Sequence, residues 1–353
     1  MKNDWQTKNL GDLCRVRTGR KDVNEGNPDG EFPFFTCAAE HTFSDNYSFD
    51  TEALLIAGNG DVGKVSYYNG KFEAYQRTYV LSDFIDVLPR FLFLILDGKL
   101  KETVSKQKLG NTMPYIKVGM LTDFHLPVPP LAEQQRIVGL LDEAFKGIAT
   151  AKANAEKNLQ NARALFESHL QSVFTKRGTG WLKNRLEECF RLKSGDGLIS
   201  KEMKGGGYSV YGGNGIAGTH DEFNLSGDNV IIGRVGALCG NARHITEEIW
   251  LTDNAFKVVD QCFEFDGAFL TYLLNFKDLR SFARQAAQPV ISNSSLKDVT
   301  LTFPQIREQK RIAATLDDLH EETQRLAMLY ERKQAALEAL KKSLLHQAFS
   351  GEL

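Results

Sequence analysis

The sequence contains one long unit twice, and this repeat limits the possible folds more than any other feature. The second copy follows the first at an offset of about 175 residues, and both ends of the unit match. The matched pairs are Trp5 with Trp181, Leu10 with Leu186, Gly19 with Gly195, Leu126–Ile137 with Leu301–Ile312, and Phe174 with Phe349. Two copies are too few, and each is too long, for a solenoid. The repeat therefore predicts a pseudo-symmetric molecule, which suits a roughly two-fold target such as duplex DNA.

Composition places the chain among ordinary soluble proteins. Its 353 residues are enough for two domains, and its hydrophobic (42%) and charged (25%) fractions are typical of soluble chains. The N-terminus is polar, and the longest apolar run, Phe91–Leu96, is far too short to span a membrane. Five cysteines form no C-x-x-C pair, which favours reduced thiols over a disulfide frame or a zinc site. We therefore expect a cytoplasmic protein without a bound metal.

Net charge separates two modes of nucleic-acid binding. The formal net charge is −2, and no segment has a large excess of either sign. A protein that bound DNA through bulk charge alone would be clearly basic. Any contact with nucleic acid must therefore come from local basic loops, together with partner subunits.

Each copy begins with a segment of mostly β character, residues 1–128 and 177–303. Both are rich in Gly, aromatic and β-branched residues, which favour strands and turns. The stretches that indicate buried strands include Ala53–Ala57 and Asn229–Gly233. Turn signals occur at Asn27–Gly30, Tyr67–Gly70 and Lys204–Gly207. One helix is expected in each segment, at about Leu88–Lys106 and Asp266–Gln285, so the expected fold class is α+β.

Each copy ends in a segment with the pattern of one long helix, residues 129–176 and 304–353. The helical parts, Ala132–Phe174 and Arg307–Phe349, contain no proline and extend about 65 Å each. In the second, steps of +4 and +3 give a seam at Ile312, Leu316, Leu319, Thr323, Leu326, Tyr330, Lys333, Leu337, Leu340 and Leu344. In the first, the same register gives Ile137, Leu141, Ala144, Ile148, Ala151, Ala155, Asn158, Ala162, Leu165 and His169.

These two heptad seams predict that the long helices pair with each other. A single helix of this length cannot bury its own apolar stripe, and the bulky second seam fits against the alanine-rich first one. We expect an antiparallel two-helix coiled coil that joins two mostly-β domains, as the handle of a dumbbell. The alternative is that each helix packs on its own domain.

Two glycine-rich strings match phosphate-binding patterns but lack the required context. Gly58–Val65 fits both G-x-G-x-x-G and G-x-x-x-x-G-K, and Gly213–Gly218 fits the first. Both patterns need a helix directly after the glycines, because the helix N-terminus holds the phosphate. Here a strand-like segment follows the first string and a loop-like segment follows the second. We interpret both strings as tight turns between strands.

No catalytic constellation is visible. The seven histidines form no H-E-x-x-H pair, there is no G-x-S-x-G elbow, and the chain lacks the Asn/Asp-Pro-Pro-Tyr/Phe motif of amino-methyltransferases. Two β-rich modules on a helical spacer, without chemistry, indicate a recognition protein. Two alternatives are an unrecognised nucleotide-dependent enzyme or methyltransferase, and a coiled-coil scaffold or antitoxin-like binder without a DNA role.

The block that closes each β-rich segment carries a resemblance to a known family. Leu126–Phe145 and Phe303–Leu319 resemble the signature of specificity subunits of type I restriction-modification systems, and Ser343–Leu353 looks like that family's C-terminal end. Tyr67–Ser82 and Tyr208–Gly218 are similar to segments of its target-recognition domains. The resemblance covers the whole chain, and it is specific because the signature occurs twice at the right separation.

The resemblance implies a DNA-binding subunit without catalytic activity. Residues 1–128 and 177–303 would be target-recognition domains that each read one half of a split target, and the long helices would set the gap. The implied partners are double-stranded DNA, two methyltransferase subunits and endonuclease/translocase subunits, without a membrane. S-adenosylmethionine, ATP and Mg would be bound by those partners, so no cofactor is expected on this chain. Half-sites about one helical turn, roughly 34 Å, apart fall within the span of the helices.

Bases are read chiefly by Arg on guanine and by Asn or Gln on adenine, and loops carry such residues most readily. In the first domain the candidates are Arg20, Lys21, Asn59, Lys64, Gln76, Arg77, Lys106, Lys108, Asn111 and Thr112. In the second they are Arg191, Lys193, Lys201, Lys204, Asn214, Arg234, Arg243, Asn254, Arg284 and Asn293. We favour Arg20, Arg77 and Arg234, because each lies beside Gly or in a polar turn after a strand. A solvated surface role is the alternative for each candidate.

Four polar residues open the two long helices: Gln134, Arg136, Gln309 and Arg311. The resemblance implies that they dock the methyltransferase subunits. The alternative is that they supply polarity and salt bridges at the start of each helix.

Overall fold

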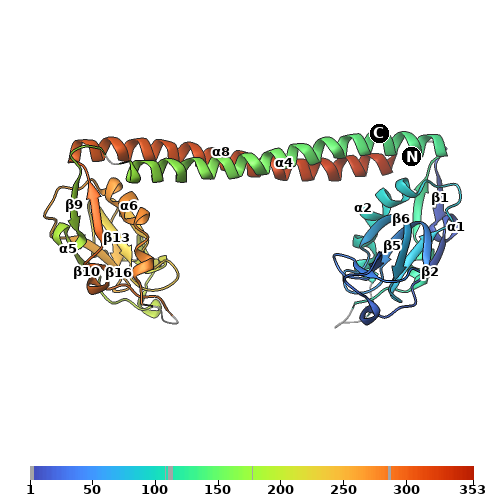
Figure 1. Ribbon diagram of the computed structural model, residues 1–353, viewed down its shortest axis with the longest axis horizontal. Helices are drawn as coiled ribbons and strands as arrows, with labels where there is room; N and C mark the ends of the chain where they lie inside the picture. Colours follow the sequence, from blue (N-terminus) through green and yellow to red (C-terminus); the bar gives the residue numbers. More distant parts are fainter. Residues whose placement is uncertain (1–3, 108, 110–113, 177, 285–287) are drawn as a thin grey trace. The chain divides into compact units, whose positions relative to one another are not determined.

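The computed structural model describes residues 4–107, 109, 114–176, 178–284 and 288–353 (Figure 1). The chain divides into two compact units. The first unit joins Met1–Glu156 to Arg332–Leu353, and the second unit is Lys157–Glu331. Each unit therefore contains one β-rich head together with a stretch of both long helices.

In the described residues, the first head has eight strands and three short or medium helices. The strands are β1 (Gln6–Asn9), β2 (Arg15–Thr18), β3 (Phe32–Phe35), β4 (Thr42–Ser44), β5 (Phe49–Ala57), β6 (Val65–Ala74), β7 (Thr78–Ser82) and β8 (His125–Val128). The helices are α1 (Leu10–Leu13), α2 (Pro89–Gln107) and α3 (Val118–Thr122), with a 3-10 turn η1 (Val23–Glu25). Six strands form one sheet in the order β2-β7-β5-β6-β3-β4.

Strand β5 lies near the centre of this sheet. Its last five residues, Ala53–Ala57, are buried, as its apolar sequence predicts. Strand β6 pairs with it on one side and β7 on the other, both antiparallel. Helix α2 packs against β5 and β6 (Figure 1). Its residues Phe91, Leu92 and Ile95 lie in the core. This helix covers one face of the sheet, and a second, smaller apolar cluster that includes Leu55, Phe72 and Val80 is separate from the core under α2.

The second head repeats this plan with a divided sheet. Its strands are β9 (Leu182–Arg185), β10 (Arg191–Ser194), β11 (Tyr208–Gly212), β12 (Gly215–His220), β13 (Asn229–Gly233), β14 (Ala242–Ile245), β15 (Ile249–Leu251), β16 (Ala255–Val259) and β17 (Thr300–Phe303). Its helices are α5 (Leu186–Cys189), α6 (Gly267–Phe276) and α7 (Asn293–Leu296), with 3-10 turns η2 (Ser200–Glu202) and η3 (Leu279–Phe282). The sheets have the orders β10-β16-β13-β14 and β12-β11-β15, and α6 packs on β13 and β14.

The first and last strands of each head pair with one another. Strands β1 and β8 are antiparallel, with Gln6 opposite Val128, and β9 and β17 are antiparallel, with Leu182 opposite Phe303. Each copy therefore closes on itself just before a long helix begins. This shared closure is the structural counterpart of the sequence repeat.

The two long helices are α4 (Leu131–Thr175) and α8 (Ile306–Ser350), each 45 residues long and within one residue of the predicted bounds. In the first unit Lys152 bonds Glu338 at 2.7 Å, and Arg136 bonds the carbonyl of Leu353 at 2.8 Å. In the second unit Arg163 bonds Glu331 at 3.2 Å. Later residues of α4 meet earlier residues of α8, so the helices are antiparallel within each unit, and the predicted fold class is confirmed.

The predicted seam is wrong at four positions that are equivalent in the repeat. Asn158, Leu165, Lys333 and Leu340 are exposed, and the next residue in each case is partly buried instead: Leu159, Phe166, Gln334 and Lys341. A strict heptad assumes 3.5 residues per turn, whereas a straight α-helix has 3.6, so the pattern drifts by about 20° per heptad. A step of one residue corrects this drift in both helices.

The ends of the long helices enter the cores of the heads. Phe174, near the end of α4, is buried in the core of the second unit, and Phe349, near the end of α8, is buried in the core of the first. Phe349 meets Phe91 of α2 edge to face, with ring centroids 5.8 Å apart. The alternative in which each helix packs on its own domain therefore fails for α8, because its last turns belong to the first unit.

Two local predictions in the heads are wrong for tertiary reasons. The turn expected at Tyr67–Gly70 lies inside β6, where pairing with β5 continues without a break. The helix expected at Asp266–Gln285 begins as expected, with the Asp266 side chain accepting a bond from the N–H of Phe269, but α6 ends at Phe276. Asp278 has a φ of 46°, a left-handed conformation that a helix cannot continue through.

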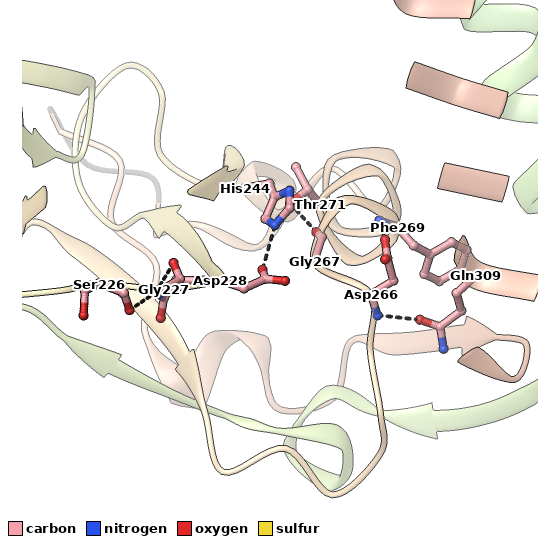
Figure 2. Close-up of polar contacts among 10 residues, drawn as sticks. Ser226, Gly227, Asp228, His244, Asp266, Gly267, Phe269, Thr271 and Gln309 are labelled. Atoms are coloured by element: carbon pink, nitrogen blue, oxygen red, sulfur yellow. Dashed lines mark hydrogen bonds and ion pairs between the residues drawn. The ribbon is translucent and has the colours of Figure 1, made fainter. Parts of the chain in front are cut away.

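One buried glutamine fixes the start of each long helix. The Gln134 amide donates to the carbonyls of Pro129 (2.8 Å) and Asp86 (3.1 Å) and accepts from the N–H of Leu88 (2.8 Å). Gln309 makes the same set of contacts in the second unit: it donates to two carbonyls and accepts from the N–H of Asp266 at 3.1 Å (Figure 2). Both side chains are almost fully buried. This network ties each long helix to the loop before α2 or α6.

Replacing Gln134 by Ala should destabilise the first unit by about 3 kcal/mol or more. The substitution leaves one buried N–H and two carbonyls without their partner, and each such loss costs about 1–3 kcal/mol. The shift in the urea unfolding midpoint measures the effect. Gln135 is exposed and adjacent, so Gln135→Ala is the matched control. Equal midpoints for the two variants would contradict a structural role for the Gln134 amide.

Candidate nucleic-acid interface

Four loops of the first head meet at one place, which we name loop cluster 1: residues 19–22, 36–41, 58–64 and 75–78. Gly19 approaches β6 so closely that a Cβ atom would overlap the carbonyl of Ala74, and its N–H bonds the carbonyl of Thr78. The N–H of Gln76 bonds the Lys21 carbonyl at 3.0 Å. The Arg77 carbonyl accepts from the N–H of Gly58 at 3.0 Å. Backbone contacts therefore hold the loops at 19–22, 58–64 and 75–78 together. Side chains add to these contacts, since the Cys37 thiol of the loop at 36–41 bonds the Arg77 carbonyl.

Loop cluster 1 contains all six candidates predicted between residues 20 and 77. Arg20, Gln76 and Arg77 are exposed, and Lys21, Asn59 and Lys64 are half-buried. The Lys64 ammonium bonds the carbonyl of Ala39, and the Gln76 amide donates to Asp22 at 3.2 Å. The guanidinium groups of Arg20 and Arg77 make no hydrogen bond or ion pair with the described part of the chain. The structure therefore brings these six residues together and leaves the two favoured arginines accessible.

The second head contains an equivalent set of loops, which we name loop cluster 2: residues 195–196, 213–215, 234–240, 252–254 and 288–291. Gly195 takes the place of Gly19, since a Cβ atom there would overlap the carbonyl of Leu251. The N–H of Arg234 bonds the Asn254 carbonyl at 2.9 Å, as Gly58 bonds Arg77 in the first head. The two clusters therefore share one backbone frame.

Loop cluster 2 holds Asn214, Arg234 and Asn254, and Arg284 joins it through an isolated bridge to Val290. Arg234 is half-buried, because its guanidinium lies over the ring of Phe256 and donates to Ser194 (3.4 Å) and to the Asp253 carbonyl (3.3 Å). The Asn214 side chain accepts from the N–H of Leu238. These contacts make Arg234 and Asn214 supports of the loops. Asn254 and Arg284 are exposed.

The remaining candidates of the second head lie outside loop cluster 2. Arg191 and Lys193 are exposed on the edge strand β10, and Arg191 lines a groove of about 580 Å³ together with Asn293. Lys201 lies in η2, and the Lys204 ammonium is 3.5 Å from Asp221.

Arg243 lies on β14, and its guanidinium packs beside Gly215, at the edge of loop cluster 2. The predicted set is therefore more scattered in the second head than in the first.

Some candidates near the end of α2 cannot be placed. Lys106 belongs to α2, but its side chain lies outside the described residues, as do Lys108, Asn111 and Thr112. Their role in contact with nucleic acid stays a prediction.

A short extended segment that no sequence pattern indicated supports each cluster. Tyr115 bridges to Asn59, and the N–H of Ile116 bonds the Gly58 carbonyl at 3.0 Å. In the second head the Ile291 N–H bonds the Arg234 carbonyl at 3.0 Å. The two isoleucines are separated by the repeat offset, so a complete alignment of the copies with each other could have found them.

The glycine strings do not form phosphate-binding loops. Gly58–Gly63 leads directly into strand β6, and the turn at Gly213 and Asn214 joins β11 to β12. Neither string opens a helix, so neither provides the helix N-terminus that phosphate binding requires. The interpretation as turns is confirmed, although Gly215–His220 is already strand.

The described residues hold no metal-binding cluster, and most of their thiols are buried. Among them, no group of three or more His, Cys, Asp or Glu side chains is placed to hold a metal ion, and no helix is both long and apolar enough to cross a membrane. The five cysteines are free, and four of them are buried. Burial raises the pKa of the Cys14 and Cys189 thiols to about 12, so both stay protonated at neutral pH. A buried protonated thiol is not a nucleophile.

The four residues predicted to dock partners differ in how far their side chains are exposed to solvent. Gln134 and Gln309 are buried and bonded inside their units, which contradicts a direct docking contact by either amide. Arg136 is exposed and bonds Glu133 at 2.7 Å, and Arg311 is exposed with its guanidinium 3.9 Å from Glu308. Of the four, only the two arginines offer a surface to a partner.

Comparison with known proteins agrees with this architecture. The family described as type I restriction modification DNA specificity domain matches residues 2–160 and 179–331. The EcoDI specificity subunit of Escherichia coli is 39% identical over 154 residues, which are 44% of this chain but only 34% of that subunit. The EcoprrI specificity subunit of Escherichia coli is 27% identical over 292 residues, covering 76% of this chain and 71% of that subunit.

Two solved structures share the fold. A chain from a study of complex assembly and conformational transition of the type I R-M system has a TM-score of 0.77 at 18% identity, covering 100% of this chain and 99% of its own. The HsdS subunit from Thermoanaerobacter tengcongensis has a TM-score of 0.64 at 18% identity, covering 100% and 98%. The matched family covers both heads and parts of both long helices, and the chain therefore belongs to the family of type I restriction modification DNA specificity domains.

Proposed function

We propose that this chain is the DNA-recognition subunit of a type I restriction-modification complex, without catalytic activity of its own. Loop cluster 1 reads one half of a split target, and loop cluster 2 reads the other half. One observation carries the proposal: in a chain of this family, the same backbone frame occurs in both heads and presents accessible arginine and amide side chains. A second class of function gains no support from the described residues.

The chemistry of the exposed side chains suits base reading in the major groove. Arginine can donate two bonds to guanine, and asparagine or glutamine can pair with adenine. Loop cluster 1 offers Arg20, Gln76 and Arg77 at its surface, and loop cluster 2 offers Asn254 and Arg284. Because the backbone frame is shared but the side chains differ, the two heads would prefer different half-sites.

Partner subunits would supply what this nearly neutral chain lacks. A net charge of −2 gives little of the phosphate attraction that drives DNA affinity. Two methyltransferase subunits, docked along the long helices, would add phosphate contacts and bind S-adenosylmethionine. Endonuclease/translocase subunits would bind ATP and Mg. Arg136 and Arg311, which are equivalent in the repeat, are the docking residues that we propose.

A binding selection from random duplexes tests the proposal. The full chain, purified with the methyltransferase expressed beside it, should enrich a bipartite sequence with a fixed gap. Enrichment of no sequence would refute DNA recognition. Calorimetry on the isolated chain distinguishes a recognition subunit from an enzyme. An enzyme would bind S-adenosylmethionine or ATP by itself, and a recognition subunit would not.

Replacing Arg77 by Ala should weaken binding at one half-site by about 1–3 kcal/mol and relax the base preference there. The loop frame should persist, because the contacts to Gly58 and Cys37 use the Arg77 backbone carbonyl. Fluorescence anisotropy with targets scrambled in either half measures the effect. Arg15→Ala is the matched control, since Arg15 is exposed at the opposite end of β2. Unchanged affinity and preference in Arg77→Ala would remove Arg77 from the reading surface.

Replacing Arg284 by Ala should affect only the other half-site, again by about 1–3 kcal/mol. The double variant with Arg77→Ala should show additive losses, because separated positions act independently. The control is Arg185→Ala, an exposed arginine of the same head on β9. A loss at the half-site that Arg77 reads would contradict the assignment of one half-site to each head.

Reversing the charge of Arg311 should weaken docking of a methyltransferase subunit by roughly tenfold or more, because a like charge at an interface opposes association. Analytical ultracentrifugation of Arg311→Glu with the partner measures this loss. Lys310→Glu is the control, since Lys310 is exposed and adjacent. Equal loss in both variants would indicate a general charge effect instead of a specific contact.

A further inference from the structure

Asp142 on α4 binds a side chain from the first turn of α2 in the first unit. Asp142 accepts bonds from the Arg90 guanidinium at 2.6 Å and 3.2 Å. A positive side chain in the first turn of a helix is disfavoured by the helix dipole. The Asp142 carboxylate offsets this cost, so the pair favours one placement of α2 against α4. Both side chains are about 40% exposed, and the contact therefore depends on geometry more than on burial.

The second unit has an aspartate at the equivalent position. Asp317 on α8 accepts a bond from the phenol of Tyr272, on α6, at 2.6 Å. Burial and the bond to Asp317 raise the pKa of Tyr272, so the phenol remains a donor throughout the neutral range. Two different donors therefore meet the same acceptor position in the two copies, which indicates that the contact itself is the shared feature.

Each aspartate acts together with the buried glutamine of the same helix. Gln134 and Asp142 are eight residues apart, about 12 Å along α4, and both contact the segment that starts α2. Gln309 and Asp317 have the same spacing. Gln309 accepts a bond from Asp266, directly before α6 (Figure 2), and Asp317 accepts a bond from Tyr272 within α6. One contact alone would leave a hinge. Two contacts at this separation also fix the direction of the head helix.

Helices α2 and α6 connect these contacts to the loop clusters. In the first unit Lys101 of α2 bonds Asp61, within residues 58–64, at 2.5 Å. In the second unit the Asn275 amide of α6 bonds the backbone of Ala242 in both directions, and Arg280 of η3 donates to the Ala237 carbonyl at 2.7 Å. A rotation of α2 or α6 about its start would therefore move the loops.

We propose that Asp142 and Asp317 are positioning residues that set the gap between the two half-sites, by fixing the angle at which each head is held on its long helix. The inference rests on the proposed function. One added base pair moves a half-site by about 3.4 Å and turns it by about 35° around the duplex. A head with a fixed angle cannot follow both changes, so it rejects a target of the wrong gap. A head that has lost its aspartate contact to the long helix can follow both changes.

The experiment compares targets that differ only in gap length. The full chain is purified with its methyltransferase subunits, and affinities are measured for the selected gap and for gaps one base pair shorter and longer. In Asp142→Ala and in Tyr272→Phe, discrimination against the wrong gaps should fall by about two- to five-fold, as expected for the loss of one exposed polar contact. Preference for the bases of each half-site should not change. Arg325→Ala removes an exposed ion pair within α8, to Glu322, and should leave discrimination unchanged.

The outcomes distinguish failure of the proposed function from failure of this inference. A wild-type complex that selects no sequence refutes the proposed function. A wild-type complex that reads both half-sites but tolerates every gap refutes this inference alone, as do folded variants that keep full discrimination. Loss of base preference together with gap discrimination would also overturn it, because the aspartate would then serve general stability. Tyr272→Phe removes a single oxygen atom, so it keeps the test decisive if Asp142→Ala fails to fold.

Discussion

Burial of one apolar stripe between α4 and α8 is the constraint on which the rest of the structure depends. Neither helix can bury its stripe alone, and the first unit is completed by residues from two distant parts of the chain. The last turns of α8 place Ala348 and Phe349 in the core of the first unit. Fully burying a phenylalanine side chain contributes about 1.5–3 kcal/mol. The core of the first head is therefore complete only when the last turns of α8 have packed into it.

The repeat separates what must be constant from what can vary. The contacts that recur in both units use backbone atoms or buried amides: the glycine approaches, the loop bridges, and the bonds of Gln134 and Gln309. The side chains on this frame differ, with Gly58 and Arg77 in one copy standing where Arg234 and Asn254 stand in the other. Sequence change at the loop surface therefore leaves the frame intact. In the proposed function, such an arrangement would let each head acquire its own target.

The sequence alone predicts the long helices almost to the residue, because many periodic positions and flanking prolines agree. It is less successful where tertiary contacts decide. Tyr67–Gly70 has turn composition but becomes strand, since pairing with β5 outweighs local preference. The burial of Gln134 and Gln309 was not predicted, because an amide near a helix start usually lies at the surface. The loop candidates of the first head came together because glycines and strand ends mark the loops, whereas those of the second head are partly on strands.

In a nearly neutral recognition subunit, the residues that select a DNA sequence would differ from those that supply general affinity for DNA. Phosphate contacts bind every sequence alike, so a basic chain would hold non-target DNA as well. With a net charge of −2, this chain would contribute mainly direct contacts to bases, and general attraction would come from its partners. Its own contribution would then depend on how accurately two loop clusters are aimed. In the proposed function, the buried glutamines and paired aspartates at the base of each head would serve this purpose, because an apolar contact would hold the helix without fixing its direction.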